Sequence, residues 1–329
     1  MKEIILLLAA GTFFGLSFGY LLFTWYKNEH YSISLPTNSI RTPEHLIAYQ
    51  QTSVFTLPIV GTPTCFAVRN DTFIIGTKTP HALWFFDENG TLLQKIDLTE
   101  EPRALACGTA ATIFSDNIVV AHTTRIAVYT HTGNIEAYWN LPDRHERRAD
   151  VRSLALTSHY LFAACTGYRR VHRFTADGHF DLMFGHFTVY ASPIVLTYSP
   201  KSDLLYVANP GKHRIEVFTQ AGEYQQELTW GEPSTDYQGF AGCCNPVGLA
   251  VLKDGRIITA EKAVPRVKVF RDGKLDCFVA GPSLLDSLPP GAVRRAPLNP
   301  GRHFAVGVLN DGRISIFDFE HNAVRFFSD

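Results

Sequence analysis

Short apolar runs separated by tight turns dominate the C-terminal half of the chain, most clearly over residues 246–281. Four of these runs have the length of a strand: Val247–Leu252, Arg256–Ala260, Arg266–Phe270 and Leu275–Val279. The third run alternates strictly between polar and apolar residues, and Asp254-Gly255 and Asp272-Gly273 are typical hairpin turns. The pattern predicts four antiparallel strands in one twisted sheet. Both faces of this sheet carry apolar residues, so it must stack against similar sheets.

The third strand of this unit occurs six times along the chain. The copies are Ala82–Phe86, Arg125–Tyr129, Arg170–Phe174, Arg214–Phe218, Arg266–Phe270 and Ala323–Phe327. Their closing aromatic residues lie 43, 45, 44, 52 and 57 residues apart. A supersecondary unit that repeats every ~40–50 residues is typical of propeller blades. The sequence therefore predicts an all-β fold, a six-bladed β-propeller.

Two segments of the chain resemble a known repeat. Lys212–Phe218, followed by Gly222, resembles the core of an NHL repeat, and Pro246–Val251 is similar to the start of one. The resemblance covers roughly residues 50–329 and is closest in the fourth to sixth copies. It implies a propeller of the NHL/TolB-like type. It implies no particular activity, because propellers of this type include binding modules as well as enzymes.

An uncharged stretch, Ile4–Tyr26, precedes the repeats. A helix of this length can cross a hydrocarbon core of about 30 Å, and no Ala-x-Ala cleavage site follows it. We therefore expect residues 1–26 to be a transmembrane anchor or signal-anchor, with a cleaved signal peptide as the alternative. Residues 27–48 are polar and are expected to be a tether. The propeller would then lie outside the cytoplasm, at a periplasmic or extracellular face, with the membrane as a partner of the chain.

Residues 49–329 are expected to form the propeller itself. The last copy of the repeat ends at Asp329, two residues after Phe327, which leaves no residues for a fourth strand. The apolar stretch around residues 51–58 can supply that strand and close the ring. Closure of this kind would remove the exposed edge that an open sheet leaves.

Composition narrows the range of partners. Thirty basic and 31 acidic residues give a net charge of −1, which provides no electrostatic indication of a nucleic-acid partner. A hydrophobic content of 46% is ample for a globular core. Six cysteines in 329 residues do not form a disulfide scaffold.

The face that carries the loops between blades is the expected location of a binding site. The repeat spacing is longest where two insertions occur, residues 231–245 and 282–301. Basic residues stand at the expected start of three inner strands: Arg103, Arg152 and Arg302, the last followed by His303. A positive channel mouth could hold a carboxylate or a phosphate. The alternative is that these arginines pair with Glu101, Asp150 or neighbouring carbonyl groups.

The adjacent cysteines Cys243 and Cys244 lie in the first insertion, just before the fifth blade. Two neighbouring thiols can form a disulfide, bind a soft metal or exchange with another thiol. The alternative is that the pair only shapes the loop. Further residues are expected to reach the same face: Tyr237, Asn245, Glu261, Lys262 and Arg266.

No set of residues in the sequence predicts catalysis or a bound metal. The 13 histidines are scattered, and only His303 is placed on an inner strand, where metal ligands would converge. No P-loop, nucleophile elbow or haem-attachment motif occurs. We therefore predict a propeller without a cofactor that binds a protein, a peptide or a small anionic ligand at the channel mouth. The alternative is a lactonase-like or lyase-like enzyme, or a thiol-redox component that uses Cys243 and Cys244.

Overall fold

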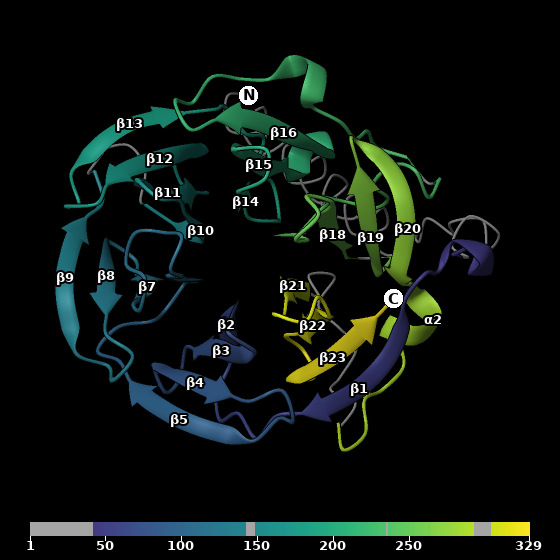
Figure 1. The fold of residues 1–329 in the computed structure, drawn as a ribbon, viewed down its shortest axis with the longest axis horizontal. Coiled ribbons are helices and arrows are strands. Elements are labelled where there is room, and N and C mark those ends of the chain that lie inside the picture. The colour runs from purple at the N-terminus through teal and green to yellow at the C-terminus, as the bar shows by residue number, and fades with distance from the viewer. Residues whose placement is uncertain (1–41, 143–148, 235, 263, 293–303) are drawn as a thin grey trace, which may run out of the picture. The chain divides into compact units, whose positions relative to one another are not determined.

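The computed structural model describes the chain over five ranges: 42–142, 149–234, 236–262, 264–292 and 304–329. Its strands form six antiparallel sheets that follow one another around a central axis (Figure 1). This arrangement is the predicted six-bladed β-propeller. The expected anchor, residues 1–26, lies outside the described ranges. Within those ranges, no helix is long and apolar enough to cross a membrane.

The first three blades each contain four strands, ordered in the sheet as they are in the chain. Blade 1 consists of β2 (Pro63–Arg69), β3 (Thr72–Thr77), β4 (Ala82–Phe86) and β5 (Leu92–Asp97). Blade 2 consists of β6 (Ala104–Cys107), β7 (Ile118–Ala121), β8 (Arg125–Tyr129) and β9 (Ile135–Asn140). Blade 3 consists of β10 (Val151–Leu156), β11 (Tyr160–Cys165), β12 (Arg170–Thr175) and β13 (Phe180–Phe184).

Blade 5 follows the same scheme, whereas blades 4 and 6 depart from it in their outer strands. Blade 4 consists of β14 (Val195–Ser199), β15 (Leu204–Asn209) and β16 (Arg214–Thr219). Blade 5 consists of β17 (Gly248–Val251), β18 (Ile257–Glu261), β19 (Arg266–Arg271) and β20 (Lys274–Ala280). Blade 6 consists of β21 (Phe304–Val308), β22 (Ile314–Asp318), β23 (Ala323–Ser328) and the N-terminal strand β1 (Gln50–Thr56). Short helices occur at η1 (Glu44–Leu46), η2 (Pro210–Lys212), η3 (Gln226–Leu228) and α2 (Pro282–Leu285).

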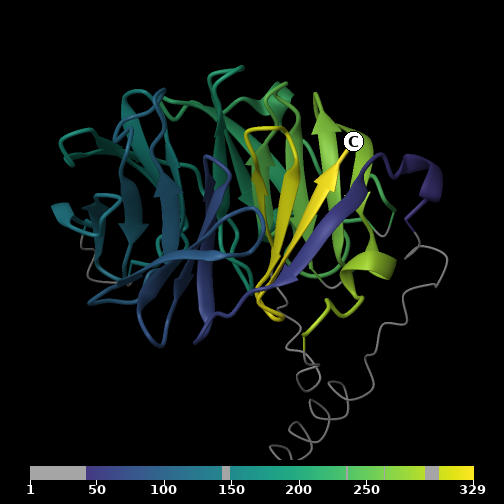
Figure 2. The same cartoon turned by 60° about the horizontal axis from the view of Figure 1, so that its bottom comes forward.

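Strand β1 is the outer strand of blade 6, beside β23 (Figures 1 and 2). The two strands pair antiparallel from Gln50 opposite Ser328 to Thr56 opposite Ala323. Phe55 of β1 also packs edge-on against Phe326, with 6.2 Å between the ring centroids. The strand that the sequence suggested around residues 51–58 therefore covers the edge of β23, which would otherwise expose unpaired backbone groups.

The hydrophobic core lies between adjacent blades rather than inside a single sheet. Between blades 1 and 2, for example, Ile74 and Leu83 pack in one cluster with Leu105 and Val120. Each sheet thus buries both of its faces against neighbours, which explains why most inner and middle strands are apolar on both faces. The starts of the inner strands and the loops between blades remain available to form a site.

Candidate functional site

The inner strands surround a cavity of about 460 Å³ in the central channel. All six blades contribute to its lining, and below the strand starts its walls are mainly apolar: Phe66, Leu105, Leu196, Leu249 and Val306. The hydroxyl groups of Thr64 and Ser153 on these walls already form hydrogen bonds with backbone groups. Thr64 Oγ1 donates to the Gly76 carbonyl at 3.2 Å, and Ser153 Oγ is bonded to the backbone of Leu196. A ligand inside the channel would therefore meet apolar side chains beside hydroxyl groups that already have partners.

Two arginines from adjacent blades meet at the channel mouth. Arg103 directly precedes β6, and Arg152 lies at a bulge of β10, where the register shifts between Val151 and Ser153. Bulges often redirect a side chain in this way. Arg103 Nη2 lies 3.0 Å and Arg152 Nε lies 2.7 Å from the same atom, Asp150 Oδ1. One carboxylate therefore serves two guanidinium groups, and the cluster keeps one excess positive charge.

Two buried donors at this mouth have no hydrogen-bond partner among the described residues. They are Arg103 Nε and Ser192 Oγ. Ser192 is only 1% exposed and lies in the connection between β13 and β14. Tyr190, from the same connection, also lines the cavity but is 75% exposed. Because an unpaired buried polar group costs about 1–3 kcal/mol, an acceptor atom of a ligand would be favourable here.

The structure brings together only some of the residues proposed for the mouth. Arg103 and Arg152 do converge, and their pairing with Asp150, given above as the alternative, is also present. Arg302 and His303 lie outside the described residues. Sequence reasoning missed Tyr190 and Ser192 because the spacing between blades 3 and 4 is not expanded. Their place in a connection between blades was the signal that could have indicated them.

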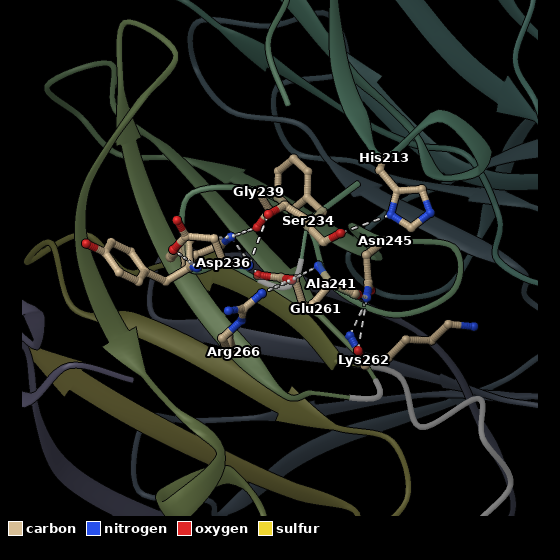
Figure 3. A network of polar contacts seen from close by, with 12 residues as sticks. His213, Ser234, Asp236, Gly239, Ala241, Asn245, Glu261, Lys262 and Arg266 are labelled. Atoms are coloured by element: carbon tan, nitrogen blue, oxygen red, sulfur yellow. Dashed lines mark hydrogen bonds and ion pairs between the residues drawn. The ribbon is translucent and has the colours of Figure 1, made fainter. Parts of the chain in front are cut away.

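The first insertion, residues 231–245, is held to blade 5 by a buried ionic network (Figure 3). At its centre lies Glu261, the last residue of β18, whose side chain is 0% exposed. Glu261 Oε2 accepts a hydrogen bond from the Ala241 amide at 3.0 Å and pairs with Arg266 Nη2 at 2.8 Å. Glu261 Oε1 pairs with Lys268 Nζ at 2.8 Å. One carboxylate thus connects the insertion to two cations of β19.

Lys268 adds a second connection to the insertion. Its Nζ donates to the carbonyl groups of Tyr237 at 3.1 Å and Gly239 at 2.7 Å. The ammonium group also lies 4.6 Å from the ring centroid of Phe240 and 5.3 Å from that of Phe270. Burial lowers the pKa of Lys268 to about 8, although the charge of Glu261 opposes this shift. The polar face of β19 is therefore buried beneath the insertion.

These contacts assign a place to the other proposed site residues. Glu261 and Arg266 face the insertion, and Tyr237 lies within it, where its carbonyl accepts from Lys268. Asn245 Oδ1 accepts from the Lys262 amide at 2.8 Å, and Asn245 Nδ2 donates to the Lys262 carbonyl at 3.0 Å. Within the described part of the chain, no residue of 231–245 lines the channel cavity. The insertion and the arginine cluster are thus two separate groups of residues.

Cys243 and Cys244 lie within this insertion as free thiols. Their sulfur atoms are 3.0 Å apart; Cys243 is exposed, and Cys244 is 1% exposed with φ +61°. The Cys244 thiol raises the pKa of Cys243, burial adds to this effect, and the charge of Lys262 opposes it. Across the described residues, no three His, Cys, Asp or Glu side chains are placed to hold a metal ion together.

Comparison with known proteins identifies the fold and no more. No protein-family model and no curated protein matches the chain. Among solved structures it is similar to a protein of unknown function from Bacteroides thetaiotaomicron, with 14% identity and a TM-score of 0.60 over 82% of this chain and 69% of that chain. It is also similar to a catalytically inactive virginiamycin B lyase from Staphylococcus aureus with quinupristin, with 15% identity and a TM-score of 0.57 over 83% of each chain.

A third similar structure is the β-propeller domain of Cps50 (Swd1) from Myceliophteria thermophila, with 10% identity and a TM-score of 0.52 over 85% of this chain and 99% of that chain. The names of these three proteins describe no common function. At such low identities the similarity concerns the path of the backbone and not the residues of a site. The chain therefore shares the β-propeller fold with all three.

Proposed function

We propose that the chain is a membrane-anchored propeller, located outside the cytoplasm, that binds a small ligand at the mouth of its channel. The ligand would carry one anionic group, a carboxylate or a phosphate, on an apolar body. One observation carries this proposal: Arg103 and Arg152 share the single carboxylate of Asp150 above an apolar cavity.

The charge at the mouth supports an anionic group. Guanidinium groups have several donors in a fixed plane and match carboxylate or phosphate oxygens well. A second carboxylate, supplied by a ligand, would balance the excess positive charge beside Asp150. The Nε donor of Arg103 and the hydroxyl of Ser192 would then find acceptors.

The size and walls of the cavity support an apolar body. A volume of about 460 Å³ lies within the range of small-molecule pockets, ~300–1,000 Å³. Since the wall hydroxyls already bond to backbone groups, the channel offers few polar partners below its mouth. Apolar ligand surface is therefore what these walls would stabilise.

Titration calorimetry of the purified full-length chain tests this function. The probes are 4-phenylbutyrate, which has both features, 4-phenylbutan-1-ol, which lacks the charge, and butyrate, which lacks most of the apolar body. We expect 4-phenylbutyrate to bind most tightly, and the R103Q/R152Q variant to lose at least tenfold in affinity for it. The R69Q variant is the control, because Arg69 pairs with the exposed Asp116 outside the cavity. Equal affinity for phenylbutyrate and phenylbutanol, or no loss in R103Q/R152Q, would refute the proposal.

The anchor has its own test. The uncharged stretch Ile4–Tyr26 supports it, since its length suits a membrane span. The full-length chain should remain in the membrane fraction after carbonate extraction, and a chain that begins at residue 49 should not. A protease added to spheroplasts with an intact cytoplasmic membrane should digest the propeller, whereas protection from that protease would contradict the proposed location.

The second candidate function is a lyase-like propeller enzyme, suggested only by the similarity of fold to virginiamycin B lyase. Incubation of the full-length chain with quinupristin, followed by mass analysis of the antibiotic, separates the two functions. A binding protein leaves the antibiotic intact, and a lyase converts it.

A further inference from the structure

The two thiols of the first insertion differ in their access to solvent. Cys243 is exposed, whereas Cys244 is buried directly behind it. Their sulfur atoms are only 3.0 Å apart, so a bond between them needs no large movement. The accessible thiol is therefore adjacent to a second thiol that solvent does not reach.

The backbone on both sides of the pair is fixed by side chains of blade 5. On one side, the Ala241 amide donates to Glu261 Oε2 at 3.0 Å. On the other side, the Asn245 side chain bonds to both the amide and the carbonyl of Lys262. The two cysteines lie between these anchors. This arrangement keeps the thiols close together and favours reaction between them over reaction with separate partners.

We propose that Cys243 and Cys244 form a thiol–disulfide exchange site whose substrate is a low-molecular-weight disulfide. This inference is independent of the ligand proposed for the channel. In the first step the Cys243 thiolate attacks one sulfur of the small disulfide, which releases one small thiol and leaves a mixed disulfide on Cys243. In the second step the Cys244 thiolate attacks Cys243 Sγ and releases the second small thiol. The protein dithiol loses two electrons and two protons, and the small disulfide gains them.

The other cysteines are unsuited to this chemistry. Burial raises the pKa of Cys65 and that of Cys107 to about 12, and raises the pKa of Cys277 to about 11. Cys165 is buried in β11, and its pKa is also raised. Because the thiolate is the attacking species, these residues react slowly. Cys107, which is intermediate in exposure, is a suitable control.

The charges around the pair predict how exchange depends on pH. The Cys244 thiol raises the pKa of Cys243, while Lys262 acts in the opposite direction. The thiolate fraction of Cys243, and with it the rate of the first step, should therefore increase as the pH rises through the alkaline range.

The test uses the purified full-length chain, equilibrated with mixtures of oxidised and reduced glutathione and then alkylated for peptide mass spectrometry. The wild-type chain should form a bond between Cys243 and Cys244, seen as a loss of two hydrogens from that peptide. The C244S variant should stop at the mixed disulfide and accumulate glutathione on Cys243. The C243S variant should accumulate at least tenfold less, because Cys244 is buried. The C107S variant should behave like the wild type.

Three results would overturn the proposal. The first is a wild-type pair that remains as two thiols in every mixture. The second is a wild-type chain that retains glutathione on Cys243, because the second step then fails. The third is equal glutathione incorporation by C243S and C244S, because the two thiols then have no separate roles. Circular dichroism of each variant would show whether it is folded, and a variant that fails to fold is replaced by its alanine counterpart.

Discussion

The ionic network under the first insertion allows a quantitative prediction. The Glu261→Gln substitution keeps the shape of the side chain and removes its charge. Arg266 and Lys268, which are 2% and 0% exposed, would then be buried cations without their carboxylate. Removing one partner of a buried ion pair costs about 3–5 kcal/mol, because the remaining charge stays buried and uncompensated. We expect a loss of this size in the free energy of unfolding.

The assay is urea unfolding of the full-length chain at pH 7, followed by tryptophan fluorescence. Trp230 is a local reporter, since its ring centroid lies 5.9 Å from that of Phe270, next to Lys268. The control is D116N, which breaks the pair between Arg69 and an Asp116 side chain that is 81% exposed. An exposed pair contributes only about 0–1 kcal/mol, so D116N should change little.

A third variant separates lost charge pairing from general damage. When the whole buried group is replaced by apolar residues, the desolvation cost disappears together with the attraction. The triple substitution E261M/R266M/K268M should therefore be more stable than E261Q alone. The reasoning is refuted if E261Q loses no more stability than D116N, or if the triple variant is less stable than E261Q.

Two further predictions concern closure and pH. A chain that begins at residue 49 should fold, whereas a chain that begins at residue 59 lacks β1 and should melt at a lower temperature, because β23 loses its outer partner. Equal melting temperatures of the two chains by calorimetry would contradict the role of β1 in closing the ring. The pKa of Lys268 is about 8 in the folded chain, below the ordinary lysine value of 10.5 expected in the unfolded chain. Between these pH values the unfolded chain therefore binds a proton that the folded chain has released. The contribution of Lys268 to the free energy of unfolding should therefore rise with pH across that window. Urea titrations at several pH values should show this rise in the wild-type chain and not in the K268M variant. The same pH dependence in the wild type and K268M would show that the pKa of Lys268 is not lowered.

The sequence alone determined the repeating architecture. All six third strands were located within one residue of their ends, for example Ala82–Phe86 as β4 and Arg266–Phe270 as β19 (Arg266–Arg271). The strands could be located because period-2 alternation and tight turns depend only on residues that are close together in the sequence. Strand β1 was also indicated locally, since the last repeat lacks an outer strand and an apolar run lies at the other end of the repeats.

The tertiary structure alone decided which of these residues meet. The alternation in β19 marked Arg266 and Lys268 as polar but did not show that residues 231–245 cover them, because the path of an insertion depends on contacts distant in sequence. For the same reason, Arg103 and Arg152 could be placed at equivalent positions, but not on a single carboxylate. Ser192 has no sequence pattern of its own, and it belongs to the channel mouth only because the ring places its loop there.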